Sequence, residues 1–271
     1  MRRELEVAAS RWRLVPPRAA PAGRAGERLG RGTGNSLEFM DFRDYVPGDD
    51  LRRVDWSGFA RTDQLRVRLY REEVAPALDI VADVSGSMAS TPAKEQALRD
   101  LVDACAMWSA RAGGVPRRLL PGGGAGQATE ALILGGEDSR TLLPAVPLRR
   151  QSVRVLISDF LRQADPAPDV QRIASGGAQL IVMQLLDPWE LDPDPDDATC
   201  TLVDAESARR LDATLDARTV AGYLARLNRL SATLERAVRA AGGTFVRVPA
   251  GAPDVMFHDV LLPAGVLEPA R

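Results

Sequence analysis

The sequence predicts an α/β fold in which a mostly parallel sheet carries helices on both faces. Short runs rich in Val, Ile and Leu, typical of buried strands, recur in the second part of the chain. Helical patterns lie between or after these runs, at 92–111, 165–175 and 220–238. Buried strands that alternate with helices are characteristic of parallel sheets covered on both sides.

Each predicted strand is short, apolar and bounded by turn residues or by a helical pattern. The runs taken as strands are 78–83, 115–120, 131–134, 153–158, 179–186 and 244–248. The segments at 201–204 and 208–212 are expected to form a small hairpin, and 253–262 a final short helix. Apolar residues at three- and four-residue steps in the helical patterns indicate core packing.

The stretch Asp83-Val84-Ser85-Gly86-Ser87 follows the first buried strand. Its carboxylate therefore lies at the carboxyl end of a strand, the edge of an open α/β sheet where ligands bind. Because alternate residues of an extended loop face the same point, we expect Asp83, Ser85 and Ser87 to converge. One carboxylate and two hydroxyls suit a hard cation, Mg²⁺ or Mn²⁺, better than zinc. The sequence predicts a cation site with spare coordination positions.

Helix capping is the alternative interpretation of these residues, because Ser and Asp are common at helix N-termini. Capping accounts for only one of the three side chains. It also leaves unexplained a second buried strand that ends in Ser158-Asp159. Metal binding is therefore the favoured interpretation.

The pattern Asp-x-Ser-x-Ser after an apolar strand resembles the metal-ion-dependent adhesion site of von Willebrand factor type A domains. The resemblance implies that a Thr and a second Asp from later loops complete the site, and that an acidic group of a partner takes the open position. Asp159 matches the second Asp. Thr141, which opens a helix-like stretch, is the better candidate for the Thr, with Thr129 behind it.

The block 38–61 is the most distinctive part of the sequence. Pro47-Gly48 sets a turn, and Asp49 or Asp50 is expected to cap a short helix whose apolar and aromatic residues are buried. Arg and Asp alternate in a way that permits several ion pairs. The block closely resembles the signature of the bacterial domain-of-unknown-function 58 (DUF58) family, whose members join it to a von Willebrand A-like domain. Many relatives carry two transmembrane helices ahead of this block, and no such stretch is expected here.

Three segments follow from these patterns. Residues 1–34 hold eight Arg against three Glu, with several Gly and Pro, and are expected to form a basic arm with one short helix that docks only locally. Residues 35–75 are the family motif segment. Residues 76–271 are expected to form the von Willebrand A-like domain.

The composition narrows the function classes. Basic and acidic residues nearly balance, at 35 against 37, so the net charge does not indicate binding to nucleic acid or to a charged membrane surface. Lys94 is the single lysine, and the other 34 basic residues are Arg, which indicates a coding bias rather than phosphate binding. Two cysteines form neither a disulfide framework nor a metal cluster. With no signal peptide or membrane span in the sequence, we expect a cytoplasmic protein.

The sequence favours a non-enzymatic adaptor over an enzyme. A cation with an open position attracts an incoming carboxylate, so the site is expected to dock an acidic group of a partner. The family resemblance implies that the partner is a MoxR-type AAA+ ATPase and its client. The alternative is a metal-dependent hydrolase that uses Asp83 and Asp159, although no general base or second metal site is evident.

Overall fold

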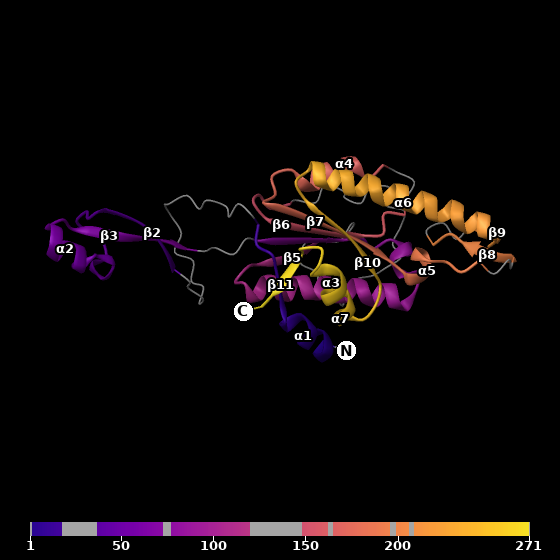
Figure 1. Ribbon diagram of the computed structural model, residues 1–271, viewed down its shortest axis with the longest axis horizontal. Coiled ribbons are helices and arrows are strands. Elements are labelled where there is room, and N and C mark those ends of the chain that lie inside the picture. The colour runs from indigo at the N-terminus through magenta and orange to yellow at the C-terminus, as the bar shows by residue number, and fades with distance from the viewer. Residues whose placement is uncertain are drawn as a thin grey trace. The chain divides into compact units, whose positions relative to one another are not determined.

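The computed structural model describes residues 2–17, 37–72, 77–119, 148–161, 165–195, 199–205 and 209–270. The chain divides into two compact units (Figure 1). Unit 1 comprises Met1–Ala22 and Pro76–Arg271, and unit 2 comprises Gly23–Ala75. Unit 2 is therefore inserted into the sequence of unit 1. The predicted ligand Thr141, its alternative Thr129 and the strand expected at 131–134 lie outside the described residues.

A five-stranded sheet with the order β10-β7-β6-β4-β5 forms the centre of unit 1. Every neighbouring pair in it is parallel. Its strands are β4 (Leu78–Ala82), β5 (Pro116–Leu119), β6 (Val153–Ser158), β7 (Gln179–Leu186) and β10 (Thr244–Pro249). All residues of β4 and β6 are buried, which explains why these strands are continuous apolar runs rather than alternating patterns. The predicted fold class is confirmed.

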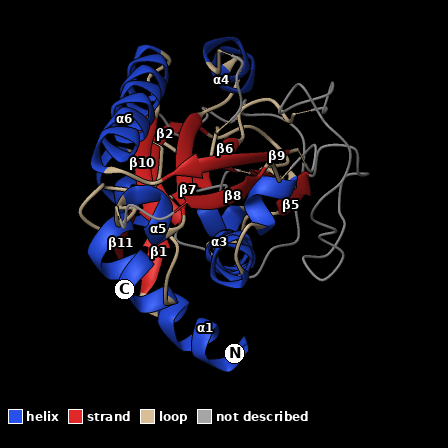
Figure 2. Cartoon of the chain, turned by 90° about the vertical axis from the view of Figure 1, so that its right-hand side faces the viewer, coloured by secondary structure: helices blue, strands red, loops and turns tan. Residues whose placement is uncertain are grey.

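Helices cover both faces of the sheet (Figure 2). The helices of unit 1 are α1 (Arg2–Ser10), α3 (Pro92–Arg111), α4 (Ala167–Ala174), α5 (Pro188–Leu191), α6 (Ala217–Ala240), α7 (Pro253–Val255) and the π-helical segment Met256–Leu261. None of the helices in the described ranges is long and apolar enough to cross a membrane.

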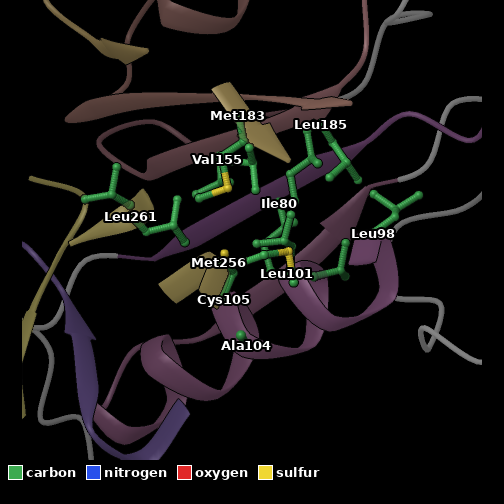
Figure 3. Packing of buried hydrophobic residues seen from close by; sticks show 14 of the residues in the cluster. Ile80, Leu98, Leu101, Ala104, Cys105, Val155, Met183, Leu185, Met256 and Leu261 are labelled. Atoms are coloured by element: carbon green, nitrogen blue, oxygen red, sulfur yellow. The ribbon is translucent and has the colours of Figure 1, made fainter. Parts of the chain in front are cut away.

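Two hydrophobic clusters hold the helices on the sheet. On one face, Ile80, Val155 and Met183 of the sheet pack with Leu101 and Cys105 of α3 (Figure 3). The second cluster joins sheet residues to α4 and α6. Its members include Val81, Leu156, Val182, Ile173 and Leu234. Successive residues of β4, such as Ile80 and Val81, therefore serve opposite cores, as the two-residue period of a strand requires.

The described part of the N-terminal segment, residues 2–17, contains the expected short helix, α1, but packs into unit 1 more extensively than an arm that docks only locally. Leu5, Ala8 and Ala9 of α1 are buried in the first cluster, and the indole Nε1 of Trp108 donates to the carbonyl of Ala9 at 2.9 Å. β1 (Trp12–Leu14) pairs antiparallel with β11 (Leu267–Pro269). The Arg-rich composition concealed an apolar stripe with three- and four-residue spacing, which packs α1 against α3.

Two smaller two-stranded sheets complete the described chain. β8 (Thr199–Val203) and β9 (Arg210–Thr214) form the predicted hairpin in unit 1. In unit 2, β2 (Leu37–Asp44) pairs antiparallel with β3 (Arg66–Glu72). Between them lie a 3-10 turn, η1 (Leu51–Arg53), and the helix α2 (Trp56–Thr62).

Polar contacts in unit 2 follow the predicted motif chemistry. Asp50 caps η1 by accepting from the backbone N of Arg52 at 3.0 Å. The guanidinium of Arg43 donates to both carboxylate oxygens of Asp49, at 2.7 and 2.6 Å, and thereby spans the Pro47-Gly48 turn. The expected ion pairs are thus present in the motif.

The expected burial of the motif's apolar residues is wrong for Leu51, Trp56 and Phe42, of which Phe42 is 38% exposed. Trp56 is 54% exposed and Leu51 is 55% exposed. Val54 is buried instead, because it forms a β-bridge with Val67, which is also buried. The alternation of charged and apolar residues identified the motif, but it did not predict which of the apolar side chains are buried.

Asp79 anchors the opposite, amino-terminal end of the sheet. Its buried carboxylate accepts from the backbone N and the Nε of Arg149, both at 2.8 Å, from Arg117 Nε at 3.1 Å and from Ser152 Oγ at 3.1 Å. Burial alone raises the pKa of Asp79, but the contacts with Arg149 and Arg117 outweigh it and place the pKa below its usual range. The carboxylate therefore stabilises the fold in its charged form.

We predict that Asp79→Ala lowers the free energy of unfolding by about 3 kcal/mol at neutral pH, because two guanidinium groups lose their carboxylate. The pKa of Asp79 is lower in the folded state. The contribution of Asp79 to the free energy of unfolding is therefore complete above its unfolded-state pKa of about 3.9. It is lost as the pH falls through the lower folded-state pKa. Urea unfolding at a series of pH values measures this, with Asp169→Ala, which removes an exposed pair, as control. A difference between wild type and Asp79→Ala that persists unchanged in acid would contradict the prediction.

Candidate functional site

The carboxyl ends of β4 and β6 form the topological switch point of the sheet. From β4 the chain continues to β5 on one side, whereas β6 lies on the other side of β4. Loops that leave such a pair diverge, and ligands of open α/β sheets bind there. Asp83 follows β4 directly, and Asp159 follows β6 directly. The structure thus brings both predicted carboxylates to one edge.

Asp83 is held by donors from its own loop and from β6. Its side chain is 1% exposed. One carboxylate oxygen accepts from Ser158 Oγ at 2.6 Å, and the other accepts from the backbone N of Ser85 at 3.0 Å. The hydroxyls of Ser85 and Ser87 are in contact at 3.1 Å. The hydroxyls of Ser85 and Ser87 are thus hydrogen-bonded to each other, and the backbone of Ser85 contacts Asp83. Convergence of all three side chains on one cation stays a prediction.

Helix capping does not account for these serines. The following helix, α3, is capped by Thr91, whose Oγ1 accepts from the backbone N of Lys94 at 3.1 Å. Ser85 stands at the N-cap position of the 3-10 turn η2 (Gly86–Ala89), yet its side chain makes no capping hydrogen bond. The two hydroxyls are thus oriented toward each other rather than toward a helix end.

The donor set fits a small hard cation. Ligands of Mg²⁺ lie about 2.1 Å from the ion in an octahedron, so neighbouring ligand oxygens are about 3 Å apart. The separation of 3.1 Å between the Ser85 and Ser87 hydroxyls matches this spacing. In the described part of the chain no three His, Cys, Asp or Glu residues cluster to hold a metal ion. A cation at this edge would therefore depend on the hydroxyls, and Thr141 stays a predicted ligand.

Lys94 binds the second predicted carboxylate. Its side chain is completely buried, and Nζ donates to Asp159 Oδ2 at 2.9 Å and to Glu190 Oε1 at 2.8 Å. The other oxygen of Asp159 accepts from the backbone N of Leu161 at 3.0 Å. The ammonium thus occupies one side of the Asp159 carboxylate, so the direct role of Asp159 as a metal ligand stays a prediction.

The short helix α5 closes the same edge from β7. Asp187 caps α5 by accepting from the backbone N of Trp189 at 2.9 Å, and Glu190 Oε2 accepts from the backbone N of Asp187 at 2.7 Å. Thr91 Oγ1 donates to Asp187 Oδ2 at 2.6 Å. Together with Lys94, these contacts connect α5 to the start of α3.

Helix α6 reaches the edge through two polar contacts. Tyr223 donates its hydroxyl to the carbonyl of Glu190 at 2.9 Å. Burial, followed by the nearby charges of Glu190 and Asp159, raises the pKa of Tyr223 to about 12, so the hydroxyl keeps its proton at neutral pH. Ser231 donates to Gln184 Oε1 at 2.7 Å, and Gln184 Nε2 donates to the carbonyl of Asp159 at 3.1 Å.

Phe160, next to Asp159, has a backbone φ of 58°. A bulky residue in the left-handed region is strained and persists only where its surroundings enforce it. Here Phe160 is buried, and its backbone N donates to Ser158 Oγ at 3.0 Å, the same hydroxyl that binds Asp83. These contacts hold the backbone of Ser158 and Phe160 at the end of β6.

Sequence reasoning placed the strand ends correctly but missed the role of Lys94. Lys94 is the single lysine among 35 basic residues, and this could have indicated that it has a specific role. The Asp187-x-x-Glu190 spacing was a second signal, because it is the pattern of a capping box. Neither signal indicates that the two acidic residues of different strand ends share one ammonium group.

We predict that Lys94→Met lowers the free energy of unfolding by about 3 to 4 kcal/mol, because Asp159 and Glu190 would then be charged, close together and without a cation. Adding Asp159→Asn and Glu190→Gln to Lys94→Met should recover part of this loss, since the uncompensated charges are removed. Urea unfolding measures each variant. Glu95→Gln, on the same turn of α3 but in an exposed pair with Arg99, is the control. A Lys94→Met protein as stable as the control would contradict the prediction.

Comparison with known proteins adds family information for part of the chain. The profile of a family described as "Protein of unknown function DUF58" matches residues 41–114. This range contains the Pro47-Gly48 motif and the Asp83–Ser87 loop. Uncharacterized proteins of Mycobacterium bovis and of two strains of Mycobacterium tuberculosis are each 28% identical in an alignment of 207 positions that covers 67% of this chain. The chain spans 65% of the length of these relatives.

Among solved structures, an aerotolerance-related membrane protein from Bacteroides fragilis, crystallised with multiple mutations to serine, is similar over 70% of this chain and 98% of its own. The sequence identity is 13% and the TM-score is 0.30. The DUF58 resemblance indicated by the sequence is thus supported over residues 41–114.

Proposed function

We propose that this protein is a non-enzymatic adaptor in which Asp83, Ser85 and Ser87 hold a divalent cation, Mg²⁺ or Mn²⁺, that docks an acidic group of a partner. The observation that carries the proposal is the pair of serine hydroxyls, 3.1 Å apart, beside Asp83 at the topological switch point. The cation would supply an open coordination position for a carboxylate.

The charges at this edge make docking depend on the cation. Asp83, Asp159, Asp187 and Glu190 lie at the carboxyl ends of the strands, and Lys94 supplies an ammonium to two of them. An acidic partner group would meet an excess of negative charge there, and like charges repel over these distances. A bound dication reverses this repulsion locally at Asp83. Docking of an acidic group should therefore require the bound cation.

Asp159 gives less support to the alternative of a metal-dependent hydrolase. That mechanism requires Asp83 and Asp159 to act together, whereas the buried ammonium of Lys94 binds Asp159 Oδ2 and repels a second cation there. An aspartate bound in this way is a structural counter-ion more readily than a ligand or a base. Turnover of phosphoester and peptide substrates with Mg²⁺ or Mn²⁺, lost in Asp159→Ala, would establish the hydrolase instead.

The partner that we propose is a MoxR-type AAA+ ATPase, with a client protein. This step rests on the resemblance to the von Willebrand A-like members of the DUF58 family. The matched range 41–114 includes residues 41–61 of the motif block and the cation loop. We place the function in the cytoplasm, since both Cys105 and Cys200 are free thiols, as in a reducing compartment.

We predict that wild-type protein binds Mn²⁺ and that Asp83→Ala and Ser85→Ala weaken the binding at least about tenfold. Ser90→Ala, a hydroxyl of the same loop outside the donor set, serves as the control. Electron paramagnetic resonance of free Mn²⁺ measures the affinity. Pull-down of the AAA+ ATPase with and without chelator then tests docking in the same variants. A partner retained equally in every variant and condition would refute cation-dependent recruitment.

A further inference from the structure

Two exposed apolar side chains lie on the edge that carries the proposed cation site. Trp189 of α5 is 50% exposed, and Leu161, three residues after β6, is 36% exposed. β4, β6 and β7 are consecutive strands of the sheet, so the Ser85 and Ser87 hydroxyls, Leu161 and Trp189 follow three neighbouring strand ends. Single exposed apolar residues are ordinary, but these two share an edge with a donor set.

Trp189 is presented on a helix that the surrounding contacts hold rigid. A helix of four residues is not stable by itself. α5 persists because its capping box is closed by Asp187 and Glu190, and because Lys94, Thr91 and Tyr223 each bind one of these two residues. These contacts fix the backbone beneath the indole and leave half of the side chain in solvent.

Leu161 is fixed by the same network. Its backbone N donates to Asp159 Oδ1, and Asp159 Oδ2 accepts from Lys94, which also binds Glu190 beside Trp189. The strained φ of 58° at Phe160 sets the direction in which the chain leaves β6. One buried ammonium therefore orders the loops beneath both exposed side chains.

A surface ordered before binding loses little conformational entropy when a partner docks, and exposed Trp residues are frequent binding hot spots. We propose that Trp189 and Leu161 form the specificity surface of the docking site and select a partner segment that carries an apolar side chain near its acidic residue. This inference rests on the proposed cation-dependent docking. It adds to that proposal the kind of peptide segment that the docking site binds.

The strand spacing gives the separation that the partner segment must span. Neighbouring strands are about 4.8 Å apart, so the end of β4 and the end of β7 are about 10 Å apart. An extended peptide advances about 3.3 Å per residue. Because side chains of an extended peptide alternate between its two faces, the apolar residue should stand four positions before or after the acidic residue, which keeps both on one face over about 13 Å. The side chain halfway between them then faces Leu161.

Immobilised synthetic octapeptides of Gly and Ser provide the probe. One carries a single Glu, a second adds Leu four positions away, and a third places Leu next to Glu, on the opposite face of an extended chain. Binding of the full chain in the presence of Mn²⁺ is measured by surface plasmon resonance, and Mn²⁺ affinity is measured separately by electron paramagnetic resonance. Trp189→Ala is compared with Trp56→Ala, whose indole is similarly exposed, at 54%, but belongs to unit 2.

The peptide with the four-residue spacing should bind about tenfold more tightly than the peptide with Glu alone. This preference should disappear in Trp189→Ala and persist in Trp56→Ala, with Mn²⁺ affinity unchanged in both. Equal binding of all three peptides by a protein that binds Mn²⁺, or a preference retained in Trp189→Ala, would overturn the inference and leave cation-dependent docking standing. Absence of Mn²⁺ binding in wild type would overturn both.

Discussion

The buried ammonium group of Lys94 is the interaction on which the carboxyl edge of the sheet depends. It binds carboxylates that follow two different strands, Asp159 after β6 and Glu190 after β7. Its position in the first turn of α3 opposes the helix dipole, which disfavours positive charge there. A buried ion pair of this kind is retained only with good geometry and further hydrogen bonds, and both carboxylates have them.

This arrangement separates the acidic residues of the edge into two systems. Asp159 and Glu190 share one ammonium group that the chain itself provides. Asp83 is instead held by a hydroxyl from Ser158 and a backbone N–H from Ser85, beside the hydroxyl pair of the loop. Neutral donors orient a carboxylate without cancelling its charge. The proposed cation loop therefore lies beside a carboxylate that Ser158 and the backbone of Ser85 orient, where the strand order reverses.

The positions of strands and helices could be predicted from the sequence, because the spacing of apolar and polar residues shows which side chains are buried. Gln179–Leu186 and Pro92–Arg111, for example, are found where the apolar patterns indicated them. Contacts between side chains distant in sequence were not accessible in this way. Nothing local to Lys94 identifies Glu190 as its partner, 96 residues away. Composition was also misleading for α1, since its arginines suggested a solvated arm although Leu5, Ala8 and Ala9 are buried.

The pairing of β1 with β11 has a consequence for biosynthesis. The partners Trp12 and Pro269 lie at opposite ends of unit 1, with all of unit 2 between them in sequence. During translation, β1 leaves the ribosome long before β11 is synthesised. β1 therefore stays unpaired while the intervening chain is translated. The β2 and β3 contacts of unit 2 are much closer in sequence and close first. Chain growth thus imposes an order in which the inserted unit matures before the unit that surrounds it.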